Sequence, residues 1–204
     1  LRALVPNGTK IEIVTTKSPE GLEVVRHSAA HVMAQAVQAL WPDVKVTIGP
    51  VVENGFYYDF DSPRTFSPDD FEKIEKKMME IINADLEIKR EEMDAEQAKA
   101  TFAKLGEKFK LELIDDIVAE TGTKTVGIYH NGDQWFDLCR GPHVQRTGQI
   151  KAVKLMSIAG AYWRADETRE QLQRVYATAF TDKKDLDQYL SRLEEAKKRD
   201  HRKL

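Results

Sequence analysis

Residues 24–35 read VVRHSAAHVMAQ and place two histidines, His27 and His31, four residues apart in a pattern of helical period. Apolar residues recur at the same spacing, at Ala30, Met33, Val37 and Leu40. Side chains three or four positions apart share one face of a helix. The stretch therefore predicts a helix with one apolar face for a core and a separate face that carries both imidazoles.

The limits of this helix are marked on both sides. Ser18 has a typical N-cap side chain, and Pro19 suits the first helical position. The pair Trp41-Pro42 ends the pattern, because a proline disfavours helical geometry in the residue before it. We expect a helix from Pro19 to Leu40.

Three Asn-Gly pairs predict three β-hairpins, because both residues accept the left-handed geometry of tight hairpin turns. The pairs are Asn7-Gly8, Asn54-Gly55 and Asn131-Gly132, within residues 1–17, 45–60 and 124–139. A single hairpin such as residues 1–17 is not stable alone. Together with the missing initiator methionine and the charged, uncapped helix at the other end, this leads us to expect a piece of a longer protein.

The remaining segments alternate between helices and strands without a regular strand–helix–strand order. Strands are predicted at 86–93, 151–165 and 172–180; helices at 67–84, 94–105 and from Asp182 onward, while 108–120 is ambiguous and favours a helix. The expected fold class is α+β, a mostly antiparallel sheet with helices packed around a cleft and a C-terminal linker helix.

The composition excludes several classes of protein. The formal charge of −3 argues against a general nucleic-acid coat, although the last residues, EEAKKRDHRKL, concentrate positive charge. The apolar runs are too short to span a bilayer, so no membrane is expected as a partner. One cysteine among 204 residues allows no internal disulfide, which fits a reducing compartment, and we expect the cytoplasm.

The only cysteine lies in DLCRGPHV, residues 137–144, where Cys139 and His143 are also four positions apart. Two histidines at i and i+4, joined by a cysteine and a third histidine, have the ligand types of a tetrahedral zinc site. Spacing alone leaves three interpretations open: a metal site, a metal-free active site, or unrelated surface and core residues.

Two protease interpretations fit poorly. A zinc protease helix needs Glu after the first histidine, and position 28 is Ser. A thiol protease would need a histidine beside Cys139; His143 could serve, but no protease signature surrounds the thiol.

Six motifs, in the same order, make the chain resemble the N-terminal editing region of bacterial threonyl-tRNA synthetase. They are RHSAAHVMAQAV, IGPVVENGFYYDF, DLCRGPHV, SIAGAYWRADE, QRVYATAF and LEEAKKRDHRKL. The resemblance implies three parts: residues 1–17 as the end of a TGS-like domain, 18–181 as an editing domain, and 182–204 as a linker helix to an aminoacylation domain outside the chain.

The resemblance implies hydrolysis of the ester in mischarged seryl-tRNA(Thr) by water, with threonyl-tRNA rejected. His27, His31 and Lys110 match catalytic positions, with His27 and Lys110 nearest the water. Tyr58, Asp137, Cys139 and His143 match substrate-binding positions, Asp137 facing the amino group of the substrate. Arg140 beside them could contact a phosphate or hold the turn.

The related editing domain of alanyl-tRNA synthetase and its free-standing relatives is the alternative resemblance. It shares both histidine and cysteine spacings and uses zinc, but its second motif is Cys-Gly-Gly-Thr-His, where this chain has CRGPH. We expect no required metal, with zinc at His27, His31, Cys139 and His143 left open.

A non-catalytic module that binds the tRNA acceptor end is the other alternative. The implied partners are tRNA(Thr) carrying serine and the rest of a homodimeric synthetase.

Overall fold

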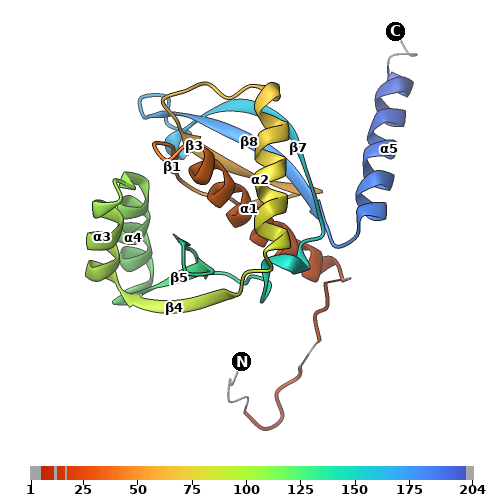
Figure 1. Ribbon diagram of the computed structural model, residues 1–204. Coiled ribbons are helices and arrows are strands. Elements are labelled where there is room, and N and C mark those ends of the chain that lie inside the picture. The colour runs from red at the N-terminus through yellow and green to blue at the C-terminus, as the bar shows by residue number, and fades with distance from the viewer. Residues whose placement is uncertain (1–5, 12, 17, 201–204) are drawn as a thin grey trace.

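The computed structural model describes residues 6–11, 13–16 and 18–200, which form two sheets, each with its own helices and apolar core (Figure 1). The larger part combines a five-stranded antiparallel sheet with α1 (Pro19–Leu40) and α2 (Phe71–Asn83). The smaller part combines a three-stranded antiparallel sheet with α3 (Ala95–Lys104) and α4 (Lys108–Thr121). The expected α+β class is confirmed.

The larger sheet has the order β1-β3-β8-β7, and β2 pairs with β3. Its strands are β1 (Lys45–Val46), β2 (Val51–Val52), β3 (Gly55–Asp61), β7 (Ala152–Tyr162) and β8 (Gln171–Phe180). Helix α1 contacts β3 and β8 and also packs on α2. This double contact explains why Ala30, Met33 and Val37 are fully buried, whereas Leu40 at the helix end is half-buried.

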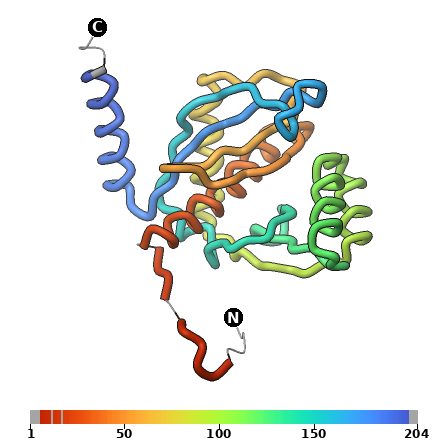
Figure 2. The backbone as a smooth tube through the Cα atoms, turned by 180° about the vertical axis from the view of Figure 1, so that it is seen from behind, coloured from red at the N-terminus to blue at the C-terminus, as the bar shows by residue number. Residues whose placement is uncertain are grey.

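The smaller sheet has the order β4-β5-β6, with β4 (Ile88–Asp94), β5 (Thr125–Asn131) and β6 (Trp135–Leu138). Its chain segment lies between α2 and β7, so the polypeptide leaves the larger part, builds the smaller one and returns. Figure 2 shows the same arrangement from behind, with the green helices α3 and α4 at the outer end of the smaller sheet. This insertion brings the smaller part next to α1 of the larger part. The predicted site residues come from both parts.

The capping signals act as expected. The Ser18 hydroxyl accepts a hydrogen bond from the Gly21 amide at 3.1 Å, and the capping box of Ser67 and Asp70 opens a short 3-10 helix, η1 (Pro68–Asp70), before α2. Asn54 and Gly132 turn their hairpins with φ of 60° and 62°. The ambiguous segment 108–120 is helical, as favoured.

Two predictions differ from the structure at their ends. The strand expected to reach residue 165 ends at Tyr162, and Trp163–Ala165 form a 3-10 turn, η3, because Arg164 and Ala165 take φ near +56°. At the N-terminus, the Asn7-Gly8 turn forms, but Leu1–Val5, the first strand of the predicted hairpin, lie outside the described residues. No strand is assigned over 9–11 and 13–16, which have no sheet beside them to join.

The last helix, α5 (Lys183–Asp200), follows β8 and touches β7 and β8 near its start. It then runs beside the larger sheet (Figure 1), and its role as a linker helix stays a prediction. Residues 201–204 of that prediction lie outside the described part. Within the described residues, no helix is both long and apolar enough to cross a membrane.

Candidate functional site

The two predicted pairs converge. Helix α1 carries His27 and His31, and the loop after β6 carries Cys139 and His143. One ligand atom from each of the four side chains lies within 4.8 Å of the others. The His143 ring is centred 4.2 Å from that of His27 and 4.1 Å from that of His31. The two pairs therefore form one cluster, which is the arrangement that the editing interpretation requires.

The loop is held against α1 by hydrogen bonds from both sides. His27 Nδ1 lies 3.1 Å from the Pro142 carbonyl oxygen, and the Val144 amide donates to Ser28 Oγ at 3.0 Å. Gly141 has a φ of +73°, and a side chain there would collide with the Tyr129 hydroxyl. A glycine is therefore required for the turn that returns the chain to the helix.

Around the Cys139 sulfur, three nitrogens meet. His143 Nε2 lies 3.2 Å away, His27 Nε2 lies 3.3 Å away, and the Gly141 amide donates to the sulfur at 3.2 Å. Burial raises the pKa of Cys139 to about 11, so the group is a thiol at neutral pH. A protonated thiol is a poor nucleophile, which weakens the thiol-protease interpretation further.

All three imidazoles are neutral near pH 7. Burial lowers the pKa of His27, and it lowers the pKa values of His31 and His143 much further, with the neighbouring imidazoles adding to the effect for those two. A neutral imidazole has one nitrogen lone pair, so each ring can accept a proton. His31 Nδ1 is buried without a hydrogen-bond partner.

A second polar group, Lys110, Asp137 and Tyr58, is almost fully buried beside the histidines. Lys110 Nζ lies 2.5 Å from Asp137 Oδ1, and the Tyr58 hydroxyl donates to Asp137 Oδ2 at 2.6 Å. Lys110 also donates to the Thr47 carbonyl at 2.6 Å. Burial and the adjacent carboxylate raise the pKa of Tyr58 well above its ordinary value, so it stays a hydroxyl. The group joins α4 and β6 of the smaller part to β3 of the larger.

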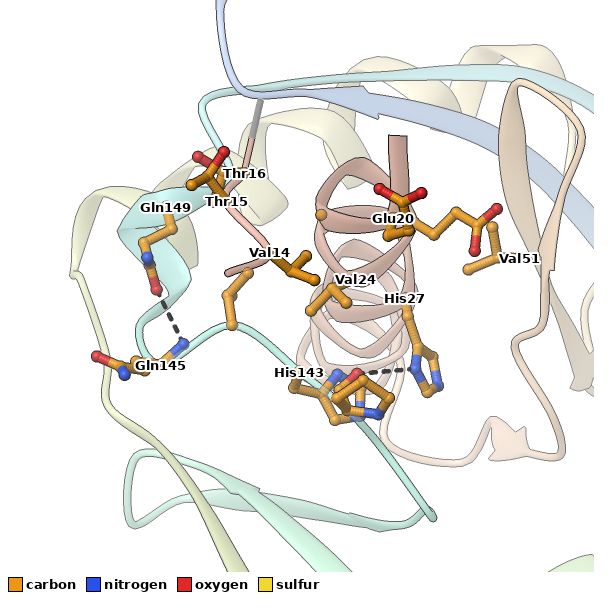
Figure 3. A pocket seen from close by; sticks show the side chains of 14 residues that line it. Val14, Thr15, Thr16, Glu20, Val24, His27, Val51, His143, Gln145 and Gln149 are labelled. Atoms are coloured by element: carbon orange, nitrogen blue, oxygen red, sulfur yellow. Dashed lines mark hydrogen bonds between the residues drawn. The ribbon is translucent and has the colours of Figure 1, made fainter. Parts of the chain in front are cut away.

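His27, His31 and this buried group line one cavity of about 300 Å³, called the inner cavity below. Its lining residues are His27, His31, Thr47, Ile48, Gly49, Pro50, Tyr58, Lys110, Leu113, Asp137, Leu138 and Cys139. His27 also lines a wider cavity of about 680 Å³ between α1, Val51 and the 142–149 loop. Figure 3 shows His27 and His143 facing each other at its inner end, with Glu20 and Gln149 nearer its outer rim.

Six of the eight predicted site residues line the cavity of about 300 Å³, and His143 lines the wider one while it contacts His27, His31 and Cys139; Arg140 lines neither. Its guanidinium is exposed and donates to Glu120 at 2.7 Å. It neither lines the inner cavity nor donates a hydrogen bond to the turn. A long cation at the surface pairs with the nearest carboxylate, and in this fold that is Glu120 of α4.

Sequence reasoning missed two residues at the site. Ser28 had been noted only as the position where a protease would have Glu, yet it contacts His143 and the loop backbone. Thr47 contributes its main-chain carbonyl to Lys110, which no side-chain pattern reveals. The position of Ser28 between the two histidines was the available signal.

The donor set suits zinc chemically. Three imidazoles and one thiol are ligands that zinc prefers, and the Pro142 carbonyl next to His27 Nδ1 is the kind of outer partner that orients a ligating histidine. His27, His31, Cys139 and His143 would hold such an ion, which would supply a Lewis acid.

Comparison with known proteins agrees with this geometry. Residues 126–176 match the family described as the threonyl and alanyl tRNA synthetase second additional domain. The threonine–tRNA ligase of Bdellovibrio bacteriovorus is 66% identical over all 204 residues, and that of Geobacter sp. strain M21 is 58% identical over the same length. The chain belongs to the threonyl-tRNA synthetase family and corresponds to its editing region.

The match extends well beyond the family domain. Syntrophotalea carbinolica has a threonine–tRNA ligase that is 59% identical over 197 residues. The chain spans 31% of the length of the Bdellovibrio and Geobacter relatives. Residues 126–176 include Asp137, Cys139 and His143 but not α1, so the histidine pair on α1 enters only through the longer matches.

Proposed function

We propose that this editing region hydrolyses the ester of seryl-tRNA(Thr) by water attack and rejects threonyl-tRNA. The single observation that carries the proposal is the convergence of His27, His31, Cys139, Lys110 and Asp137 on one small cavity in a chain of this family. Three neutral imidazoles next to a buried cation and carboxylate are the groups that ester hydrolysis uses.

The need for such a site follows from a small energy difference. Threonine and serine differ by one methyl group, and a group of that size is worth roughly 1–3 kcal/mol in a binding pocket. This is too little for translation, so a second site that admits only the smaller side chain improves fidelity. The inner cavity of about 300 Å³ is a suitable size for an aminoacyl group, with Cys139 and Leu138 among its walls.

In the proposed mechanism, Asp137 binds the ammonium group of the substrate and His27 accepts the proton of the attacking water. His27 Nδ1 faces a carbonyl, which only accepts, so its proton lies on Nδ1 and Nε2 carries the lone pair. Lys110 places a positive charge close to the developing oxyanion. Tyr58 holds the Asp137 carboxylate in place, and His31 lies 3.8 Å from the same carboxylate.

We propose that this hydrolysis requires no metal, in keeping with the threonyl type. The four-ligand cluster specifically favours the alternative, a zinc-dependent deacylase of the alanyl type. Metal analysis of the purified chain and deacylation in the presence of EDTA separate the two. Stoichiometric zinc and activity lost to EDTA would contradict the metal-free mechanism.

The wider context is proposed on the same basis. The partners are the acceptor end of tRNA(Thr) and the rest of a synthetase that forms a homodimer in the cytoplasm. The end of the tRNA is proposed to enter through the wider cavity, which shares His27 with the inner one.

The test is the deacylation of seryl-tRNA(Thr) by His27→Ala, with threonyl-tRNA(Thr) as the second substrate. Loss of a general base lowers kcat by about 10²–10⁴-fold. His130→Ala is the matched control, because His130 lies on β5, is hydrogen-bonded to Glu91 at 2.8 Å and packs on Phe136, and among the described residues it is not one of those that line the inner cavity. Unchanged deacylation by His27→Ala removes it from the mechanism, and no deacylation by the unaltered chain favours the non-catalytic tRNA-binding module.

A further inference from the structure

Ser28 lies between the two helical histidines, fully buried, and its hydroxyl oxygen makes three contacts. It lies 2.8 Å from the Val24 carbonyl oxygen, 3.0 Å from the Val144 amide nitrogen and 3.1 Å from His143 Nδ1. The first contact lies within α1, and the second crosses from α1 to the loop after β6. The third ends on an imidazole of the site.

Counting protons assigns the direction of each hydrogen bond. A serine hydroxyl has one proton and two lone pairs. The carbonyl of Val24 can only accept and is the shortest contact, so it receives the hydroxyl proton, while the Val144 amide can only donate. One lone pair remains, directed at His143. The proton of the His143 ring therefore lies on Nδ1, and its Nε2 is an acceptor.

This assignment decides where the thiol proton of Cys139 goes. Two nitrogens lie at nearly equal distance from the sulfur, His143 Nε2 at 3.2 Å and His27 Nε2 at 3.3 Å. With Nε2 of His143 free to accept, the thiol has an acceptor there at the shorter of the two distances, and a thiol proton directed at His143 leaves His27 Nε2 free. If His143 instead carried its proton on Nε2, it would donate to the sulfur, and the thiol proton would turn to His27.

We infer that Ser28 is a positioning residue that fixes the His143 tautomer, so that the Cys139 proton is held there and His27 Nε2 stays free to accept a proton from water. This inference rests on the proposed function for its consequence in catalysis. The tautomer itself does not, because it follows from the hydrogen bonds of Ser28. Ser28 acts through His143 and Cys139 and touches no substrate.

The direct test is the tautomeric state of His143, measured by two-bond ¹H–¹⁵N correlation spectra of the histidine-labelled chain, with His143→Asn to assign its signals. In the unaltered chain we expect the proton on Nδ1. Ser28→Ala removes the acceptor, and we expect a substantial fraction of the rings to carry the proton on Nε2. A proton on Nε2 in the unaltered chain overturns the inference, whether or not Ser28→Ala folds.

The kinetic test compares Ser28→Ala with Thr147→Ala. Thr147 is a fair control because its buried hydroxyl also donates to a carbonyl, Ile81, and accepts from a main-chain amide, Leu86, but contacts no histidine. For Ser28→Ala we expect kcat for seryl-tRNA(Thr) to fall by at least about tenfold, part of what a general base contributes, with KM little changed. For Thr147→Ala we expect no such fall.

The two measurements separate this inference from the proposed function. Equal kcat values for the two alanine variants overturn the role of Ser28 while deacylation by the unaltered chain supports the proposed function. Absence of deacylation in the unaltered chain contradicts the proposed function, and the spectra then still decide whether Ser28 fixes the tautomer.

Discussion

The two parts of the molecule differ in how they are held together. The larger core is continuous, with α1 buried between the sheet and α2 and aromatic residues such as Phe56, Phe60 and Phe66 packed beside it. The smaller core is a short cluster around Phe102, Ile114 and Ile128, with several half-buried neighbours. Because buried apolar area dominates stability, the larger part is the scaffold and the smaller part depends on it.

The contact between the parts differs from either core, because a small apolar cluster of Phe109, Trp163 and Leu172 is joined there by a set of buried polar groups. Lys110 and Asp137 of the smaller part meet Tyr58 and Thr47 of the larger. Glu107, also buried, accepts hydrogen bonds from Gln38 of α1 at 2.7 Å and from the Val46 amide at 3.1 Å. We call these residues the polar interface. Hydrogen bonds and ion pairs are directional, so they fix the relative positions of side chains more than they add to the stability of the fold. This suits a site that must hold several groups in fixed positions.

The largest effect is expected from Lys110→Met, which removes the cation from the polar interface and leaves Asp137 buried without its ion-pair partner. Removing one member of a buried pair costs about 3–5 kcal/mol, because the remaining charge is uncompensated. Deacylation should fall by roughly 10²–10³-fold. Urea denaturation and seryl-tRNA(Thr) hydrolysis measure the two effects.

Lys99→Met is the matched control for Lys110→Met. Lys99 pairs with Asp115 and Glu96 at the surface between α3 and α4, where an ion pair is worth under about 1 kcal/mol. If both substitutions shift the denaturation midpoint equally, the ion pair of the polar interface contributes no more to the free energy of unfolding than a surface pair. The distinction drawn here between the polar interface and the two cores would then be wrong.

A smaller effect, confined to one part, is expected from Ile114→Ala. Its partner is Ile74→Ala in the larger core; both side chains are fully buried, and each truncation should cost about 2–5 kcal/mol. Native-state hydrogen exchange should show faster opening of β4 and β5 in Ile114→Ala and of the whole molecule in Ile74→Ala. Equal loss of protection everywhere in both variants would mean that the two parts unfold as one unit.

Much of this architecture could be predicted because its signals are local. An Asn-Gly pair fixes a turn by its own backbone geometry, and Ser18 with Pro19 starts α1 whatever packs against it. The division into two sheets could not be predicted. Alternating apolar and polar residues show which face of a strand is buried, but they do not show which other strand it pairs with. Nor could η3, where Arg164 and Ala165 adopt a left-handed backbone that neither residue type favours.

The site shows the same division. The spacing of His27 with His31, and of Cys139 with His143, indicated two faces with ligand chemistry, and the resemblance to editing domains brought in Lys110 and Asp137. The sequence could not show that these residues share one cavity, because that depends on how the inserted smaller part packs against the larger one. The partner of Arg140 was unpredictable for a related reason: Glu120 lies across a tertiary contact, and the phosphate contact of Arg140 stays a prediction.

The smallest of the three effects is expected from mild acid, and it acts on the contact between the parts rather than on either core. The pKa values of His31 and His143 are lowered by burial in the folded state, so the unfolded chain binds more protons below the ordinary histidine pKa of 6.5. Stability is therefore fully present above pH 6.5 and falls as the pH drops, by about 1.4 kcal/mol per pH unit for each such histidine.

His143→Gln should reduce this slope between pH 6 and pH 5 by about one proton, or about 1.4 kcal/mol per pH unit, in urea denaturation followed at several pH values. Thr147→Ala, which removes no titrating group, should shift the whole curve without changing its slope. An unchanged slope in His143→Gln would mean that this ring is protonated without cost in the folded chain. Since His143 belongs to the loop after β6 and contacts Ser28 and His27 of α1, such a result would mean that this contact opens while both cores stay folded.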